Sequence, residues 1–168
     1  VVNFAIAEVG LEISNKFIGV YLPTQHLGEK RKPIAEDKLK DLQQACMVVD
    51  DDIRWLVALI SDTGMRLAEA AGLLVEDIHL DAPVPYIDLK PHDHRPLKTV
   101  SSARMIPLVG VSLWAAQRVC ENRVSGCCFK RYNYGPKTSS NSASATINKW
   151  LKSVVGGTSV VHSLRHSF

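Results

Sequence analysis

Residues 50–72, DDDIRWLVALISDTGMRLAEAAG, are the stretch that decides the fold. Over residues 53–61 apolar side chains cover nearly every side of a helix, and a helix that is apolar all round belongs at the centre of a core. The acidic residues 50–52 supply a cap and a favourable charge where this helix begins. Gly64 ends it, and a second helix is predicted at about residues 66–72.

The flanking sequence predicts further helices around the buried one. Apolar residues recur at helical spacing over residues 35–48, 111–123 and 142–155. A short last helix follows Ser159, and the first ten residues read as the end of another helix. Turn residues are frequent from Leu11 to Pro33, which predicts a linker there.

The periodicity changes between Pro83 and Pro107. Residues 86–90 alternate with a period of two, which indicates a strand. We expect a short second strand at 95–99 and a third at 103–108, with tight turns between them. The predicted fold class is therefore mainly α with a small three-stranded antiparallel β-sheet (α+β).

The net charge of +3 conceals an uneven distribution. Residues 1–89 hold 8 Lys and Arg against 15 Asp and Glu, a net −7, whereas residues 90–168 hold 12 against 2, a net +10. A basic half favours an anionic partner, most commonly a nucleic acid. On charge alone, a solvated basic face without a ligand is the alternative.

The composition indicates a globular chain, with 46% apolar and 22% charged residues. No apolar run reaches the roughly 18–20 residues that a membrane-spanning helix needs. The opening residues lack the pattern of a secretory signal. The four cysteines show no metal-ligand or disulfide spacing, so we expect reduced thiols in a soluble cytoplasmic protein.

Three separate elements carry side chains suited to a phosphate. Arg66 opens a helix at a position that favours anions, and Glu69 lies on the same face, where it can orient the guanidinium. Lys98 lies on the predicted hairpin beside a Ser-Ser turn, where an ammonium can donate a proton to a leaving oxygen. His162 and Arg165, three residues apart, pair an imidazole with a guanidinium. Taken singly, each element is better explained as ordinary surface residues.

Together the three elements resemble the tyrosine recombinases of the phage integrase family. That family is marked by T-G-x-R-x-x-E, which matches residues 63–69. It then has a lysine on a hairpin that ends in an I-P-L-like strand, matched by Lys98 and residues 106–108, and later H-x-L-R-H, matched by residues 162–166. The opening residues 3–17 are similar to the family's join between its DNA-clamping and catalytic domains. The resemblance covers nearly the whole chain.

The resemblance implies a domain organisation and an activity. Residues 1–30 would be the end of a DNA-clamping domain and an interdomain linker, and residues 31–168 a partial catalytic domain. The activity would be site-specific DNA recombination or integration, by strand cleavage and rejoining through a 3′-phosphotyrosyl link. No metal or other cofactor is implied.

The resemblance also implies roles for the motif residues. Arg66 and Arg165 would clasp the non-bridging oxygens of the phosphate, and Glu69 would orient the first of them. Lys98 would protonate the leaving 5′ oxygen, and His162 would transfer a proton or hydrogen-bond to the phosphate.

The implied partner is double-stranded DNA, on which the full-length protein of a mobile element would be tetrameric. The protein would act at the nucleoid, in the cytoplasm of a bacterium or a phage host. The basic residues that we expect to contact the DNA are Arg95, Lys130, Arg131 and Lys137.

The chain departs from the family pattern in its tyrosines. All four precede Arg165: Tyr21, Tyr86, Tyr132 and Tyr134. We therefore expect a chain truncated before the nucleophile and inactive alone. Two alternatives remain, a noncatalytic DNA-binding relative or decayed remnant of an integrase, and a helical interaction module without a nucleic-acid role. A metal site at His92 and His94 is not expected, because no fourth ligand is in view.

Overall fold

The computed structural model describes residues 2–10, 12–16, 18, 33–157, 159–165 and 167. The chain divides into two compact units, residues 1–30 and 31–168. In the first unit, helix α1 (Val2–Val9) buries none of its residues, and Phe4 is 70% exposed. Most of the linker predicted between Leu11 and Pro33 lies outside the described residues.

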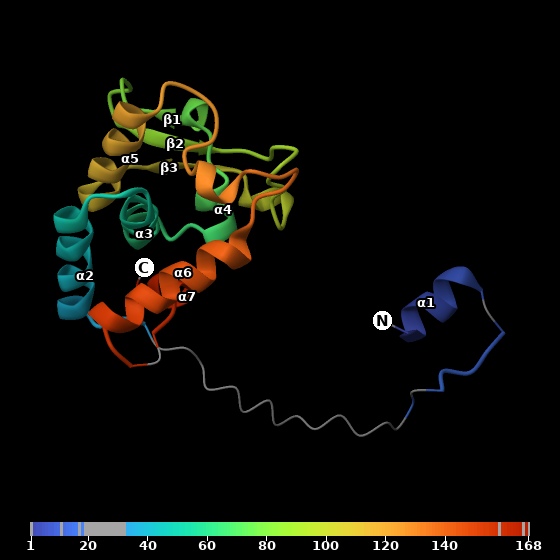
Figure 1. The fold of residues 1–168 in the computed structure, drawn as a ribbon. Coiled ribbons are helices and arrows are strands. Elements are labelled where there is room, and N and C mark those ends of the chain that lie inside the picture. The colour runs from blue at the N-terminus through green and yellow to red at the C-terminus, as the bar shows by residue number, and fades with distance from the viewer. Residues whose placement is uncertain are drawn as a thin grey trace. The chain divides into compact units, whose positions relative to one another are not determined.

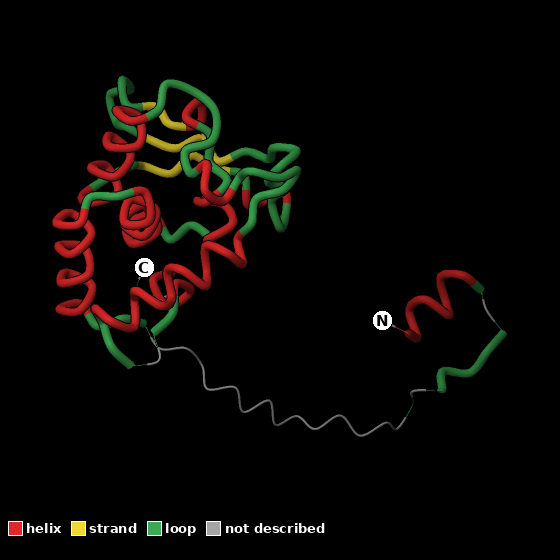
Figure 2. The backbone as a smooth tube through the Cα atoms, in the orientation of Figure 1, coloured by secondary structure: helices red, strands yellow, loops and turns green. Residues whose placement is uncertain are grey.

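The second unit is mostly helical (Figures 1 and 2). Its helices are α2 (Glu36–Val49), α3 (Asp52–Thr63), α4 (Leu67–Ala71), α5 (Gly110–Asn122), α6 (Ser140–Val154) and α7 (Val161–Arg165), with the 3-10 helices η1 (Val75–Asp77), η2 (Val100–Ser102) and η3 (Lys130–Tyr132). The predicted helices of this unit are present, with ends close to those expected from the apolar spacing. None of the helices that the structure describes is both long and apolar enough to cross a membrane.

Helix α3 lies at the centre of the second unit, as its apolar sequence predicts. Figure 1 shows it between α2, α5 and α6, and it packs against α2, α5 and α7. Its residues from Trp55 to Ile60 are all buried. The Asp51 carboxylate caps its start by accepting a hydrogen bond from the Arg54 backbone N–H at 3.0 Å. Gly64 ends it in the left-handed region, at φ 59°, which a glycine adopts without strain.

Asp62, near the end of α3, also caps the next long helix. One of its carboxylate oxygens accepts hydrogen bonds from the backbone N–H groups of Val111 (2.8 Å) and Ser112 (3.1 Å), in the first turn of α5. Its other oxygen accepts one from the Gln43 side chain of α2 at 2.6 Å. A single half-buried carboxylate thus ties three helices together.

The sheet has three antiparallel strands in the order β1-β2-β3: β1 (Ile78–His79), β2 (Tyr86–Leu89) and β3 (Arg104–Pro107). Ile87 of β2 faces Ile106 of β3 in the register. The structure confirms the predicted fold class and the strands expected at 86–90 and 103–108.

The strand predicted at residues 95–99 is wrong. His92 and Arg95 exchange backbone hydrogen bonds across a tight turn, and the chain that follows runs irregularly to η2. The Arg95 side chain points into the core and holds the start of this segment there. Residues 95–99 therefore pair with no described strand. The third strand is β1 instead, whose two residues are too few to show any alternation.

Candidate functional site

Arg66 is held at the N-terminus of α4 by the buried carboxylate of Glu69. The Arg66 Nη1 atom donates to Glu69 Oε1 at 2.7 Å, and the Arg66 backbone N–H donates to Oε2 at 2.9 Å. The Glu69 side chain is 4% exposed, whereas that of Arg66 is 36% exposed. The carboxylate therefore orients the guanidinium from its buried side and leaves part of the guanidinium open to an anion.

Arg165, near the other end of the chain, contacts the loop that precedes Arg66. Its Nη1 atom donates to the carbonyl oxygen of Gly64 at 3.1 Å, two residues before Arg66. Among the described residues, no carboxylate lies within ion-pair distance of the Arg165 guanidinium. His162 lies one turn earlier in α7, and its side chain is exposed.

Lys98 lies in the irregular segment between β2 and β3, and its side chain is exposed. The adjacent Thr99 hydroxyl is 2.9 Å from the Ser102 hydroxyl. The Ser102 oxygen in turn accepts a hydrogen bond from Arg66 Nη1 at 3.2 Å. Two hydroxyl groups thus connect the segment that carries Lys98 to the first arginine.

Arg104 belongs to this cluster and was missed by the sequence reasoning. Its Nη1 atom donates to the Ser102 carbonyl oxygen at 2.8 Å, and its Nη2 atom lies 3.5 Å from Glu69 Oε2. A signal was available, because β-strand alternation puts Arg104 on the same face as the buried Ile106. A charged residue on an inward face requires a partner.

The cluster is strongly cationic. Arg66 and Arg104 share the carboxylate of Glu69, Arg165 is held on the Gly64 carbonyl two residues before Arg66, and an exposed lysine lies on the neighbouring segment. Fixed guanidinium groups with one shared carboxylate leave an excess positive charge, which favours a bound phosphate.

Arg95 requires a correction, because the structure places it in the core rather than at a DNA-facing surface. It is 1% exposed, and its Nη2 atom donates to Asp77 Oδ2 at 3.2 Å while Nε donates to the Gly72 carbonyl at 3.0 Å. Burial lowers the pKa of Arg95, and the nearby Asp77 opposes that shift. A Cβ added at Gly72 would lie 2.6 Å from Arg95 Cδ, so the close approach requires glycine.

The other basic residues predicted to contact DNA lie at the surface. Lys130 and Arg131 are exposed in η3, and Lys137 is exposed in the loop that follows. Arg131 Nε lies 3.2 Å from Asp52 Oδ2, so part of its charge is already paired within the chain.

The two histidines considered for a metal have other partners. His92 Nε2 lies 2.9 Å from both oxygens of Asp77, and His94 Nε2 lies 2.9 Å from the Gly72 carbonyl oxygen. Over the part of the chain that the structure describes, no group of three His, Cys, Asp or Glu side chains is arranged to hold a metal ion.

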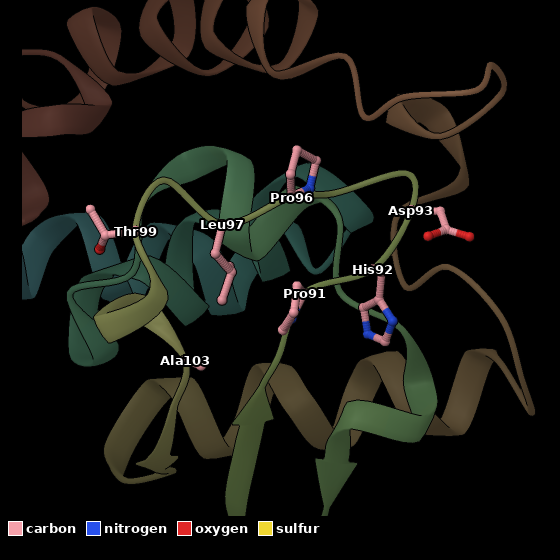
Figure 3. A pocket seen from close by; sticks show the side chains of 7 residues that line it. All are labelled: Pro91, His92, Asp93, Pro96, Leu97, Thr99 and Ala103. Carbon is pink, nitrogen blue, oxygen red and sulfur yellow. The ribbon is translucent and has the colours of Figure 1, made fainter.

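A cavity of about 630 Å³ lies beside the segment that carries Lys98 (Figure 3). It is lined by Pro91, His92, Asp93, Pro96, Leu97, Thr99 and Ala103. Figure 3 shows these side chains on the two arms of the β2–β3 connection, with Thr99 and Ala103 next to η2.

The chain belongs to the phage integrase family, since that family's model matches residues 32–168. No curated protein sequence matches the chain. The recognition made from the three motifs is thus confirmed at the level of the family.

Solved structures show the same fold. XerA recombinase is 17% identical, with a TM-score of 0.63, over 99% of this chain and 56% of that one. The Tn1549 transposon integrase in complex with a circular intermediate DNA is 18% identical, with a TM-score of 0.68, over 99% of this chain and 62% of that one. The same integrase in complex with transposon right end DNA is 20% identical, with a TM-score of 0.64. This chain therefore spans about three fifths of the length of these structures.

Proposed function

We propose that this chain supplies the phosphate-binding part of a site-specific DNA recombinase that acts through a 3′-phosphotyrosyl intermediate. The observation that carries the proposal is the 3.1 Å hydrogen bond from Arg165 Nη1 to the Gly64 carbonyl oxygen. It brings two arginines that are far apart in the sequence to one loop, where both can contact a single phosphodiester. The DNA present in the Tn1549 integrase structures supports a DNA partner.

The two arginines stabilise the negative charge that develops at phosphorus. Attack of a tyrosine oxygen adds a fifth oxygen and concentrates charge on the non-bridging oxygens. Arg66, preoriented by Glu69, and Arg165, preoriented by the Gly64 carbonyl, donate to those oxygens without having to reorganise during the reaction. These fixed cations neutralise the negative charge on the non-bridging oxygens, a role that a metal ion has in other phosphoryl-transfer sites.

Lys98 and His162 carry out the proton transfers. The bond from phosphorus to the 5′ oxygen breaks as the bond to the tyrosine oxygen forms, and Lys98 gives the leaving oxygen its proton. His162 transfers a proton or hydrogen-bonds to the phosphate. Both side chains are exposed.

The nucleophile itself is proposed to come from sequence outside these 168 residues, which makes the chain inactive alone. Tyr132 is 1% exposed in the core, and Tyr86 stacks on His79 within the sheet. We further propose that residues 1–30 join the domain at 31–168 to a DNA-clamping domain, and that the full-length protein recombines DNA of a mobile element as a tetramer.

Binding of the 168-residue chain to duplex DNA tests the phosphate site directly. Fluorescence anisotropy at several salt concentrations gives the slope of log K against log salt. Arg66→Ala and Arg165→Ala should each lower the affinity and flatten the slope by about 1, because each removes one phosphate contact. Arg118→Ala is the matched control, since this arginine is also 36% exposed in its side chain but pairs with Asp50 and Glu121. Unchanged slopes for both site variants would count against the proposal.

Strand cleavage by the full-length protein tests the chemistry. A nicked duplex that releases a short fragment on cleavage traps the covalent intermediate, which migrates slowly on a denaturing gel. A covalent adduct that disappears in Arg165→Ala is the expected result. DNA binding without any adduct would favour a noncatalytic relative.

A further inference from the structure

The segment that carries Lys98 has little packing beneath it. Residues 96–99 are not part of a strand, and they border the cavity of about 630 Å³ shown in Figure 3. Only Leu97 among them packs partly against the core. With few apolar contacts and no ladder of backbone hydrogen bonds, the position of this segment depends on its polar contacts.

Those polar contacts converge on Ser102, at the end of η2. Its backbone N–H donates to the Thr99 carbonyl oxygen at 3.0 Å, and its hydroxyl lies 2.9 Å from the Thr99 hydroxyl. The same hydroxyl accepts from Arg66 Nη1 at 3.2 Å. Ser102 is 4% exposed, so these contacts are shielded from water.

Arg104 holds Ser102 from the other side. One edge of its guanidinium donates to the Ser102 carbonyl at 2.8 Å, and Nη2 lies 3.5 Å from the Glu69 carboxylate. A single planar group therefore connects the turn that ends the Lys98 segment with the carboxylate that orients Arg66.

We propose that Arg104 is a positioning residue that sets the Lys98 segment relative to Arg66. The inference rests on the proposed function, because the two residues must act on the same phosphate for their spacing to matter. Arg104 acts through Ser102 and Glu69 and need not contact DNA. Without it, Glu69 still orients Arg66, whereas the turn at Ser102 loses the contact that fixes its carbonyl group.

Lysine cannot replace Arg104 in this role. The two contacts of Arg104 use two nitrogens of one rigid, planar fork, and an ammonium is a single point donor on a flexible stem. Arg104→Lys keeps the charge and can reach one partner at a time. It separates the effect of charge from the effect of geometry.

Hydrogen exchange on the 168-residue chain tests the placement without any catalysis. In Arg104→Ala, and nearly as much in Arg104→Lys, the Ser102 amide, which donates to the Thr99 carbonyl oxygen at 3.0 Å, should exchange about tenfold faster, because a hydrogen bond from a charged donor no longer stabilises the turn. Exchange in α3 reports whether the variant is folded and should be unchanged. Arg118→Ala serves as the control. Exchange of the Ser102 amide equal to that of the unsubstituted chain would overturn the proposal.

Cleavage of a modified DNA by the full-length protein tests the consequence. A substrate with sulfur in place of the bridging 5′ oxygen releases a thiolate, which leaves without a proton donor. Lys98→Ala and Arg104→Ala should both cleave ordinary DNA at least about tenfold more slowly and recover on the sulfur substrate. Arg66→Ala should not recover, because its effect is on the phosphate. An Arg104→Ala defect that sulfur does not relieve would show that Arg104 acts elsewhere.

The two experiments separate the inference from the proposed function. If the unsubstituted full-length protein forms no covalent adduct, the proposed function fails. The exchange measurement then still shows whether Arg104 holds the segment that carries Lys98.

Discussion

Replacing Arg95 tests whether this side chain stabilises the core, as the structure indicates, or contacts DNA, as the sequence suggested. We predict that Arg95→Met destabilises the domain and leaves DNA binding unchanged. The side chain is 1% exposed, its Asp77 partner is fully buried, and Nε donates to the Gly72 carbonyl oxygen at 3.0 Å. Methionine fills a similar volume, so the effect measured is that of the lost charge and hydrogen bonds.

The magnitude follows from the contacts that remain. Breaking a buried ion pair from one side costs about 3–5 kcal/mol. Two features place Arg95→Met at the lower end of this range. Asp77 keeps His92 at 2.9 Å and Lys90 at 3.7 Å, and the substitution removes the buried Nη1 atom, which has no hydrogen-bond partner among the described residues. We expect a loss of about 3 kcal/mol, which for a domain of this size lowers Tm by roughly 10 °C.

Urea unfolding followed by circular dichroism measures this loss as a lower midpoint at an unchanged m-value. Arg131→Met is the matched control. Its partner Asp52 lies at 3.2 Å, but the Arg131 side chain is 54% exposed, so its loss should cost at most about 1 kcal/mol. DNA binding of Arg95→Met should keep the salt slope of the unsubstituted chain. A loss of stability below about 1 kcal/mol together with a flatter salt slope would refute the burial argument.

Three further predictions concern the core and the surface. Asp62→Ala removes the cap of α5 and should cost about 1–2 kcal/mol in urea unfolding, with Asp62→Asn milder. Burial raises the pKa of Cys46 to about 12 and also raises that of Cys128. Both thiols therefore stay neutral and should alkylate last at pH 8, and early labelling of either, followed by mass spectrometry, would contradict this. The hydrogen bond from Arg118 lowers the pKa of Asp50. Its contribution is thus present above the ordinary value of about 4 and lost as the pH falls through the lower folded value. Asp50→Asn should remove that part of the acid dependence of stability, and an identical acid limb in both proteins would argue against the pair.

Several elements of the fold were predictable because local patterns specify them. The apolar run from Ile53 to Ile60 predicted a central helix, and Gly64 predicted its end. The apolar spacing over residues 142–155 likewise predicted α6. Such features depend on side-chain periodicity and on glycine, both of which are visible in a single sequence.

The sheet was harder to predict because its strands are so short. Residues 95–99 alternate weakly, yet the buried anchor of Arg95 on Asp77 prevents them from pairing. The two-residue strand β1 exists only because it lies beside β2, and nothing in its own sequence indicates it. Pairing across the sheet is a long-range interaction that the local pattern does not contain.

By itself the sequence determined the family, through the order of its three motifs, and it determined which side chains are suited to bind a phosphate. Only the tertiary structure decided which basic residues are free to do so. Arg95 and Arg165 are chemically the same group, but one is enclosed with a carboxylate and the other is half-buried and held on a carbonyl oxygen. Tertiary structure also brought Arg104 to Glu69, since the partner of a charged residue depends on which segments fold next to it.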